Sequence, residues 1–372
     1  MPSVHLIRWV ENLKDSEHEL FWFDVLEKGK LQTIDSVQQF TNWKNRKLPY
    51  LKGEHFLRKK FPNVYDNWNS WVEVTANQAL EKIILEIQPD VIHSFEMQSC
   101  SYPILKTMNK YSSIKWIYSC WGSDLFYYQN DDSHLAKIRN VLKRVNFIHT
   151  DCYRDYHLAV KLGFIGKHLG VIPGGTGFNL EKLNDIKLPI SERKVILVKG
   201  YQHLFGRALP VVKALESILS SIENYKVVIY GAHNEVLNYV TDKKLPFEVF
   251  DRHALSHQQV LEFMGKSIIA IGNSISDGMS NTLLEAIVMG AFPIQSNPGG
   301  VSAEIISNNE NGFLIENPHD IAAITNLIVK ALNDFELLKS ANDKNTILAE
   351  QRLSFEFNKM KVKELYSSFK KD

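Results

Sequence analysis

Cysteine is scarce in this sequence, with three residues among 372. Cys100, Cys120 and Cys152 are too few and too scattered for a disulfide framework or a zinc site, and they fit a reducing compartment. Long apolar runs are also missing, since none approaches the roughly 18 residues that a membrane-spanning helix needs. No secretory leader is recognisable, because a strand-like run, Val4–Trp9, comes almost at once. We therefore expect a cytoplasmic protein, either free or peripheral on the inner face of the cell membrane.

The sequence also lacks an excess of charge of either sign. A formal net charge of +1 argues against a general nucleic-acid binder. The even total conceals a basic and aromatic stretch over residues 42–71, because Asn42–Pro62 holds seven basic residues and one acid. Lysine and arginine beside aromatic side chains suit the headgroup layer of an anionic membrane. A solvated helical face with buried aromatic residues is the alternative interpretation.

Short apolar runs alternate with longer helical patterns, which is typical of an α/β fold with parallel sheets. The length suggests two domains, and a polar stretch at Asn179–Arg193 marks the linker. The expected strands are Val4–Trp9, Leu20–Val25, Asp90–Phe95, Lys115–Cys120, Phe147–Thr150, Gly170–Pro173, Val195–Lys199, Lys226–Tyr230, Phe247–Phe250, Ile268–Gly272, Phe292–Gln295 and Phe313–Ile315. The expected helices include Trp71–Ile87, Leu135–Arg144, Ala208–Leu219, Ser256–Met264, Thr282–Met289, Ile321–Leu332 and an amphipathic tail from Phe335 onward.

The loops that follow the strands are the place to look for a site, because ligands of open α/β sheets bind beyond the carboxyl ends of the strands. The most informative segment is Asn273–Gly300, which reads as strand end, polar loop, helix, glycine stop, strand and Gly-rich turn. Its loop can wrap backbone N–H groups around a phosphate at the start of the helix. Glu285 would then accept hydrogen bonds from the two hydroxyls of a ribose, and Asp277 would hold hydroxyls of a transferred sugar. The loop residues expected at the donor are Gly278, Met279, Ser280, Asn281 and Thr282.

Both acids also have a purely structural interpretation. Thr282 and Glu285 have the spacing of a capping box, in which the glutamate bonds back to the threonine amide. An aspartate before a helix, such as Asp277, is commonly a cap.

The segment resembles the signature of the group 1 glycosyltransferases (family 4). That signature has an acid, seven residues and a Glu, then Ala, a helix-ending Gly, a Pro-containing strand, a GG turn, another acid and an NG turn. The matching positions here are Asp277, Glu285, Ala286, Gly290, Pro293, Gly299–Gly300, Glu304 and Asn311–Gly312. Asp277 stands where the family usually has Glu, and it keeps the charge.

The resemblance implies a GT-B fold, in which two Rossmann-like domains face each other across a cleft. The acceptor-side domain would cover residues 1–180, and the nucleotide-sugar domain residues 181–350. A C-terminal helix within residues 351–372 would cross back to the N-terminal domain.

The resemblance also suggests groups for the donor. In the family an Arg at a strand end and a Lys further on hold the donor diphosphate, and the nearest basic groups here are Lys199 and Arg207. We expect them to neutralise the departing diphosphate, with two solvated surface charges as the alternative. The run Trp121-Gly122-Ser123-Asp124 matches a family loop, often His-Gly-x-Asp, that faces the donor sugar, so Trp121 and Gly122 are expected at the donor and Asp124 as a catalytic, orienting group.

Three further residues are weaker candidates. Arg252 and His253 follow a strand and are assigned to the pocket for the nucleotide base by fold-level analogy alone. His93 lies in a strand of the first half, where a histidine is more often structural than functional.

The implied reaction is retaining transfer from a nucleotide-diphosphate sugar to a glycan or lipid-linked saccharide, in polysaccharide, lipopolysaccharide or glycoconjugate synthesis. Lys199, Arg207 and the amides of residues 278–282 would stabilise the leaving diphosphate, and its oxygen would take the proton of the acceptor hydroxyl. No protein nucleophile, cofactor or metal is expected. The alternatives are a sugar-nucleotide epimerase or hydrolase of similar fold, a glycosidase that uses Asp277 and Glu285, and a non-catalytic scaffold.

Overall fold

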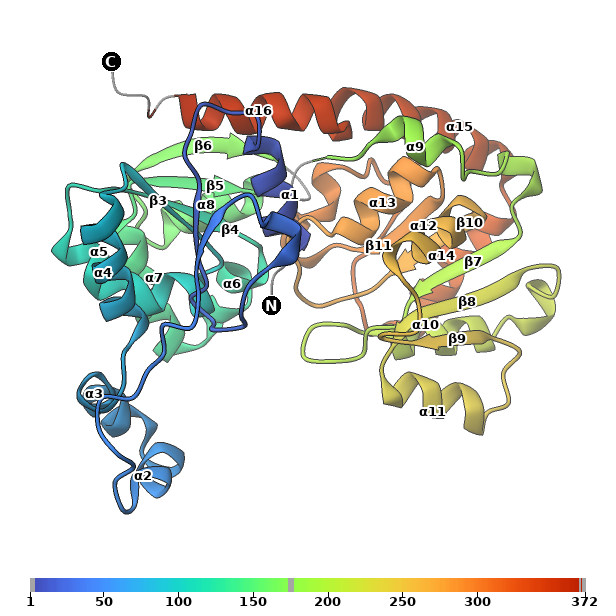
Figure 1. Cartoon of the computed structure of the whole chain (residues 1–372). Helices are drawn as coiled ribbons and strands as arrows, with labels where there is room; N and C mark the ends of the chain where they lie inside the picture. Colours follow the sequence, from blue (N-terminus) through green and yellow to red (C-terminus); the bar gives the residue numbers. More distant parts are fainter. Residues whose placement is uncertain (1–3, 173–176, 368, 370–372) are drawn as a thin grey trace. The chain divides into compact units, whose positions relative to one another are not determined.

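A computed structural model describes residues 4–172, 177–367 and 369 of the chain. Contacts between residues divide the chain into two compact units. The first comprises residues up to Thr150, Tyr156–Val171 and the described residues from Val362 onward; the second comprises Asp151–Asp155 and Ile172–Lys361. Each unit contains helices and a parallel sheet (Figure 1), so the predicted α/β fold with two domains is confirmed.

The first unit is built on a parallel sheet of strand order β3-β4-β5-β6, with a separate parallel pair β1-β2. Its core centres on β4, where Trp116 and Tyr118 are fully buried among side chains of α4 and α7. The helices and strands, with short 3-10 or π turns labelled η, are α1 (Val4–Leu13), β1 (Phe21–Phe23), η1 (Gln32–Ile34), β2 (Gln38–Phe40), α2 (Glu54–Lys60), α3 (Pro62–Val72), α4 (Ala76–Ile87), β3 (Val91–Phe95), η2 (Met97–Ser101), η3 (Tyr102–Ile104), α5 (Leu105–Lys110), β4 (Lys115–Cys120), α6 (Ser123–Phe126), η4 (Tyr128–Asn130), α7 (Asp132–Arg144), β5 (Phe147–Thr150), α8 (Tyr153–Lys161) and β6 (Lys167–Val171).

Two expectations for this half are wrong. The run predicted as a strand at Val4–Trp9 is the helix α1, in which Trp9, Asn12 and Leu13 are buried at helical spacing. A short apolar run does not distinguish a buried strand from a helix, and here the helical period decides. The helix predicted over Trp71–Ile87 is interrupted, because Thr75 and Gln78 form a capping box that starts a new helix, α4. The last residue of the predicted strand Gly170–Pro173 lies outside the described residues.

The second unit is built on a six-stranded parallel sheet of order β12-β11-β10-β7-β8-β9. Alternate residues of β7 enter the cores on its two faces: Val195 and Leu197 on one, Ile196 and Val198 on the other. Such a strand is buried on both sides, which explains its continuous apolar run. The elements are α9 (Leu180–Asn184), η6 (Ile190–Glu192), β7 (Val195–Lys199), α10 (Ala208–Glu216), η7 (Leu219–Ser221), β8 (Lys226–Ala232), α11 (Asn234–Asp242), β9 (Glu248–Asp251), α12 (His257–Gly265), β10 (Ser267–Gly272), α13 (Asn281–Met289), β11 (Phe292–Ser296), η8 (Pro298–Gly300), η9 (Ser302–Glu304), β12 (Phe313–Ile315), α14 (Ile321–Leu332), α15 (Phe335–Leu348), η10 (Ala349–Leu353) and α16 (Phe355–Ser367).

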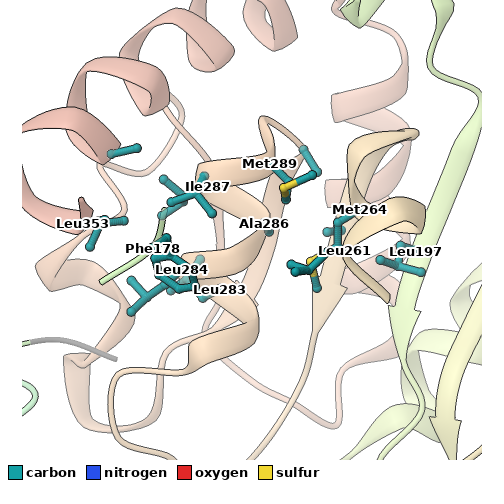
Figure 2. Close-up of a cluster of buried hydrophobic side chains, with 14 of the residues drawn as sticks. Phe178, Leu197, Leu261, Met264, Leu283, Leu284, Ala286, Ile287, Met289 and Leu353 are labelled. Carbon is teal, nitrogen blue, oxygen red and sulfur yellow. The ribbon is translucent and has the colours of Figure 1, made fainter. Parts of the chain in front are cut away.

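Helix α13, which lies within the segment Asn273–Gly300, is deeply buried. From Leu283 to Met289 every residue is buried, and Figure 2 shows Leu284 and Ile287 beside Phe178 and Leu353. The helix ends at Gly290, whose φ of 73° is the left-handed value that glycine adopts without strain. The packing fixes the start of α13 and therefore the loop in front of it.

Candidate functional site

The candidate site lies in the second unit, at the point where the strand order of the sheet reverses. Strands β7 and β10 are neighbours, while the chain runs from β7 outward to β9 and from β10 outward to β12. The loops after β7 and β10 therefore start side by side. They are joined by a bridge between Gly206 and Ser274 and by the N–H of Ile275, which donates to the carbonyl of Phe205 at 2.9 Å. Such a switch point is where doubly wound sheets bind ligands.

Basic side chains gather at the loop after β7. The Nζ atom of Lys199 lies 4.7 Å from the ring centroid of Tyr201, and the guanidinium carbon of Arg252 lies 5.8 Å from it. Partial burial lowers the pKa of His203, and the positive charges of Lys199, Arg207 and Arg252 lower it further. The structure thus brings three of the predicted donor-site residues into one cationic cluster, which suits a diphosphate.

Two histidines that were not predicted belong to this cluster. The rings of His203 and His233 lie 5.2 Å apart. Their Nδ1 atoms accept the N–H groups of Phe205 at 3.1 Å and Gln202 at 3.3 Å. In the neutral rings the hydrogen therefore sits on Nε2, and each ring offers one N–H donor. Both residues follow strands β7 and β8, which is the signal in the sequence that would have pointed to them.

Arg207 has a role within its own loop. Its Nη1 atom donates to the carbonyls of His203 at 2.8 Å, Gly206 at 2.7 Å and Leu204 at 3.3 Å. The guanidinium thus fixes the loop conformation while its charge acts on His203.

The loop before α13, residues 277–280, is called the donor loop below. The carboxylate of Asp277 accepts the N–H of Gly278 at 3.0 Å, and the N–H of Met279 donates to Asp151 at 3.0 Å. Two of the amides expected to hold a phosphate are therefore engaged by carboxylates here. Helix α13 begins at Asn281 after Ser280, so Thr282 lies inside the helix and cannot form the capping box with Glu285.

Glu285 instead pairs with a residue of another helix. Its carboxylate is buried, and Oε1 lies 2.7 Å from Nε2 of His257 at the start of α12. His253 and Arg252 lie in the exposed turn before that helix, where the N–H of His253 donates to Asp251. The sequence did not predict His257 as a partner of Glu285, because they are 28 positions apart on different helices.

The loop after β4 carries the predicted residues of the first unit. Gly122 has a φ of 92° and precedes α6, and Trp121 is half-buried. The carboxylate of Asp124 is buried and accepts the Tyr118 hydroxyl at 2.6 Å, the N–H of Trp121 at 3.0 Å and the N–H of Met97 at 3.1 Å. These bonds order the loop, so the geometry favours a positioning role for Asp124 while its catalytic role stays a prediction.

His93 is a structural residue. Its Nδ1 atom lies 2.5 Å from the hydroxyl of Tyr366, and its Nε2 atom lies 2.7 Å from Oγ of Ser119. The Tyr366 hydroxyl also accepts the indole N–H of Trp9 at 2.8 Å, so its own hydrogen points to His93. Burial, with the nearby His149, holds the pKa of His93 well below its ordinary value. The ring is neutral and both nitrogens are engaged.

One group of side chains in the described part of the chain has the spacing of metal ligands: Asp151, Cys152 and Asp155. The Cys152 thiol donates to Asp155, and the guanidinium of Arg154 forms an ion pair with Asp155 at 2.8 Å. Arg154 therefore already pairs with one of the two acids of this cluster. None of the described helices is long and apolar enough to cross a membrane.

Comparison with known proteins gives two family models. Residues 190–346 match the model described as "Glycosyl transferases group 1", and residues 1–152 match "Glycosyl transferase 4-like". No curated protein sequence gives a significant match.

Solved structures with the same fold cover nearly all of the chain. A glycosyltransferase from Rickettsia africae is 17% identical with a TM-score of 0.64, over 99% of this chain and 96% of its own. HepE from Anabaena, in complex with UDP and glucose, is 14% identical with a TM-score of 0.67, over 99% and 97%. Sucrose-phosphate synthase from Thermosynechococcus elongatus is 16% identical with a TM-score of 0.65, over 98% and 97%.

Proposed function

Because the chain belongs to the group 1 glycosyltransferases, we propose that it transfers the sugar of a UDP-sugar to a hydroxyl of a saccharide or lipid-linked saccharide, with retention of configuration. UDP is chosen because the Anabaena structure of the same fold is a complex with UDP and glucose. The acceptor class and the retaining course follow from the resemblance of the donor loop and α13 to the family signature.

The observation that carries the proposal is the pairing of two loops at the switch point. Lys199 ends β7, His203 follows it and His233 follows β8, and the loop after β10 leads into the start of α13. Two linked phosphates suit this arrangement, because cations and N–H donors lie at the ends of β7 and β8 and a helix N-terminus lies beside them. Glu285 lies one turn into the same helix, where its carboxylate accepts hydrogen bonds from a ribose.

In the proposed reaction the bond between the anomeric carbon and the phosphate oxygen breaks, and a bond from that carbon to the acceptor oxygen forms on the same face. The acceptor proton passes to the departing phosphate oxygen, so no protein base is required. Lys199 and Arg207 neutralise the charge that develops on the diphosphate, which is the interaction that speeds such a transfer. Asp277 holds hydroxyls of the sugar.

A thermal-shift series tests the donor. UDP should raise the melting temperature more than the diphosphates of the other bases, because a ligand that binds only the folded state stabilises it by mass action. Glu285→Ala should abolish the shift while the protein stays folded. An undiminished shift in that variant would overturn the assignment of the ribose.

Product analysis distinguishes the alternatives. With UDP-glucose as the probe, the proposal expects release of UDP that depends on an added saccharide acceptor. Conversion of the donor without an acceptor indicates an epimerase or hydrolase. Binding without turnover against a panel of UDP-sugars and acceptors indicates a scaffold, and cleavage of a glycoside that contains no nucleotide indicates a glycosidase.

We also propose that helices α2 and α3 contact an anionic membrane surface. Figure 1 shows them standing away from the β3–β6 sheet of the first unit. Phe56, Phe61, Trp68 and Trp71 are each more than half exposed, so the aromatic side chains of this stretch are not all buried in a core. Exposed aromatic rings beside cations suit the interface of a bilayer.

Positive charges outnumber negative ones in residues 42–71, with seven lysines and arginines against the two acids Glu54 and Asp66. Of these acids, Glu54 accepts hydrogen bonds from both Nη atoms of Arg46 at 2.7 and 2.8 Å, and these bonds lower the pKa of Glu54 to about 2. Arg58, Lys59 and Lys60 remain exposed on α2. Charge complementarity therefore favours an acidic lipid surface over a neutral one.

Co-sedimentation with vesicles of phosphatidylcholine and phosphatidylserine tests this contact. Changing Arg58, Lys59 and Lys60 to Ala should weaken binding by about 3 kcal/mol, or roughly a hundredfold, at about 1 kcal/mol for each charge. The matched control changes exposed Lys243, Lys266 and Lys339 of the second unit to Ala and should leave binding unchanged. Equal losses of binding in both variants, or no binding by the wild type, would overturn the proposal. A dimer of the wild type in solution that the triple variant no longer forms would instead assign this surface to a second copy of the chain.

A further inference from the structure

The five residues after strand β5 group with the second unit, although the strand itself belongs to the sheet of the first. Segment Asp151–Asp155 groups with residues from Ile172 onward, and the chain rejoins the first unit at Tyr156. Its side chains contact the donor loop and the turn after β11, which lie more than 120 positions away in the sequence.

Arg154 holds two loops at once. Its Nη2 atom donates to the carbonyl of Asp277 at 2.7 Å, and its Nη1 atom donates to the carbonyl of Pro298 at 2.6 Å. Its Nε atom donates to Asp155 at 2.9 Å, and the side chains of Arg154 and Asp155 are 9% and 0% exposed. The guanidinium is a rigid planar fork, so two carbonyls bonded to it are fixed relative to each other.

Contacts in the opposite direction hold the segment in place. The carboxylate of Glu304 accepts the N–H groups of Tyr153 at 2.7 Å and Arg154 at 2.8 Å. Asp151 accepts the N–H of Met279 at 3.0 Å, in the middle of the donor loop. The donor loop is therefore bonded to the segment at both Asp277 and Met279.

We propose that segment 151–155 sets the conformation of the donor loop, with Arg154 and Asp151 as positioning residues for the sugar part of the donor. This inference rests on the proposed function for its consequence in catalysis. The carboxylate of Asp277 bonds to the N–H of the next residue, so the direction in which it points depends on the loop backbone that Arg154 holds. Lys199 and His203 lie at the end of β7 and in the loop after it, and His233 follows β8. The Arg154 side chain bonds to Asp155, Pro298 and Asp277, which lie outside these segments. Loosening the donor loop should therefore disturb the position of the donor sugar more than it weakens binding of the diphosphate.

Arg154→Lys is the decisive variant. It keeps a positive charge beside buried Asp155, but a single ammonium does not reproduce the fork that spans the carbonyls of Asp277 and Pro298. Arg144→Lys is the matched control, because Arg144 of the first unit likewise donates to the carbonyls of Met108 at 2.7 Å and Ile114 at 3.0 Å.

Hydrogen–deuterium exchange of the free protein tests the conformation without a ligand. In Arg154→Lys the peptides that cover residues 274–282 should exchange at least fivefold faster, and in Arg144→Lys they should exchange as in the wild type. Asp151→Ala should also raise exchange, and Asp151→Asn should restore it, since the amide oxygen still accepts the N–H of Met279. Unchanged exchange in Arg154→Lys, or the same increase in the control, would overturn the inference.

Kinetics and binding test the consequence. With UDP and UDP-glucose as probes, Arg154→Lys should bind UDP within threefold of the wild type, while its kcat falls at least tenfold. A rise in KM with unchanged kcat, or an equal loss of affinity for UDP, would contradict the role in positioning the sugar. A wild type that neither binds UDP nor transfers glucose would refute the proposed function, and the exchange experiment would still decide the role of the segment.

Discussion

The Nε2 atom of His257 lies 2.7 Å from Oε1 of Glu285, so a half-exposed imidazole on α12 partners a buried carboxylate on α13. Solvent screens this pair, so His257→Ala should cost about 1 kcal/mol of stability or less and change the affinity for UDP by less than threefold. Glu285→Gln should weaken UDP at least tenfold, because a hydrogen bond to a charged acceptor is worth about 1.5–3 kcal/mol. Calorimetric titration of both variants checks this, and equal losses of affinity would contradict it.

The hydroxyl of Tyr230 on β8 is enclosed and makes no well-formed hydrogen bond among the described residues, with the Thr282 side chain of α13 as its polar neighbour. Burial raises its pKa, and the charge of Glu285 adds to the effect. Tyr230→Phe should leave the melting temperature of the free protein nearly unchanged or higher, since at most a poorly aligned contact with Thr282 is lost. The same variant should weaken binding of UDP-glucose threefold or more if the hydroxyl serves the ligand. A lower melting temperature without ligand would show that the hydroxyl is already used within the protein.

The neutral ring of His93 gives the stability of the first unit a dependence on pH. The pKa of His93 is well below its ordinary value of 6.5 in the folded protein, so below pH 6.5 the unfolded chain binds a proton that the folded chain does not. Its contribution is fully present above pH 6.5 and is lost as the pH falls, by at most about 1.4 kcal/mol for each pH unit. His93→Gln should flatten the rise of melting temperature between pH 5 and 6.5. His319→Gln, at an exposed position, is the control and should retain the slope.

Gly290 ends α13 in a left-handed conformation with side chains packed close around its Cα. A Cβ atom there would lie 2.4 Å from Oδ1 of Asn342, at a φ of 73°. Gly290→Ala should therefore destabilise the second unit by more than the roughly 1 kcal/mol that the backbone conformation alone costs. Gly163→Ala, with a φ of 106° and open space around the Cβ, measures that backbone cost by itself. Equal losses in denaturant titrations of the two variants would show that Asn342 moves aside.

The sequence predicted those parts of the fold in which one local signal dominates. Strand β7 was predicted with its observed bounds, because the mainly β-branched run Val195–Val198 between polar residues favours a strand buried on both faces. Helix α1 was missed, because the burial of Trp9 against the rings of His93 and His149 is a tertiary contact that its sequence does not reveal.

The site shows the same difference between local sequence signals and contacts that form only on folding. The donor loop and Glu285 could be predicted as site residues because the signature is contiguous in the sequence. Arg154 lies 123 positions from Asp277, so the bond between them is invisible in the sequence. The rule that ligands lie beyond strand ends applies to every such loop and did not single out the one after β5, because the role of Arg154 depends on partners that only folding brings near.

The path of the chain through the two units determines what a truncation removes. A fragment that stops before Val362 loses Tyr366, and with it the hydroxyl that both Trp9 and His93 contact. A fragment that begins at Ile172 loses Arg154 and leaves two of its carbonyl partners without their donor. Neither half is therefore a self-sufficient module. A chimaera of two relatives should keep segment Asp151–Asp155 with the second unit and the residues from Val362 onward with the first.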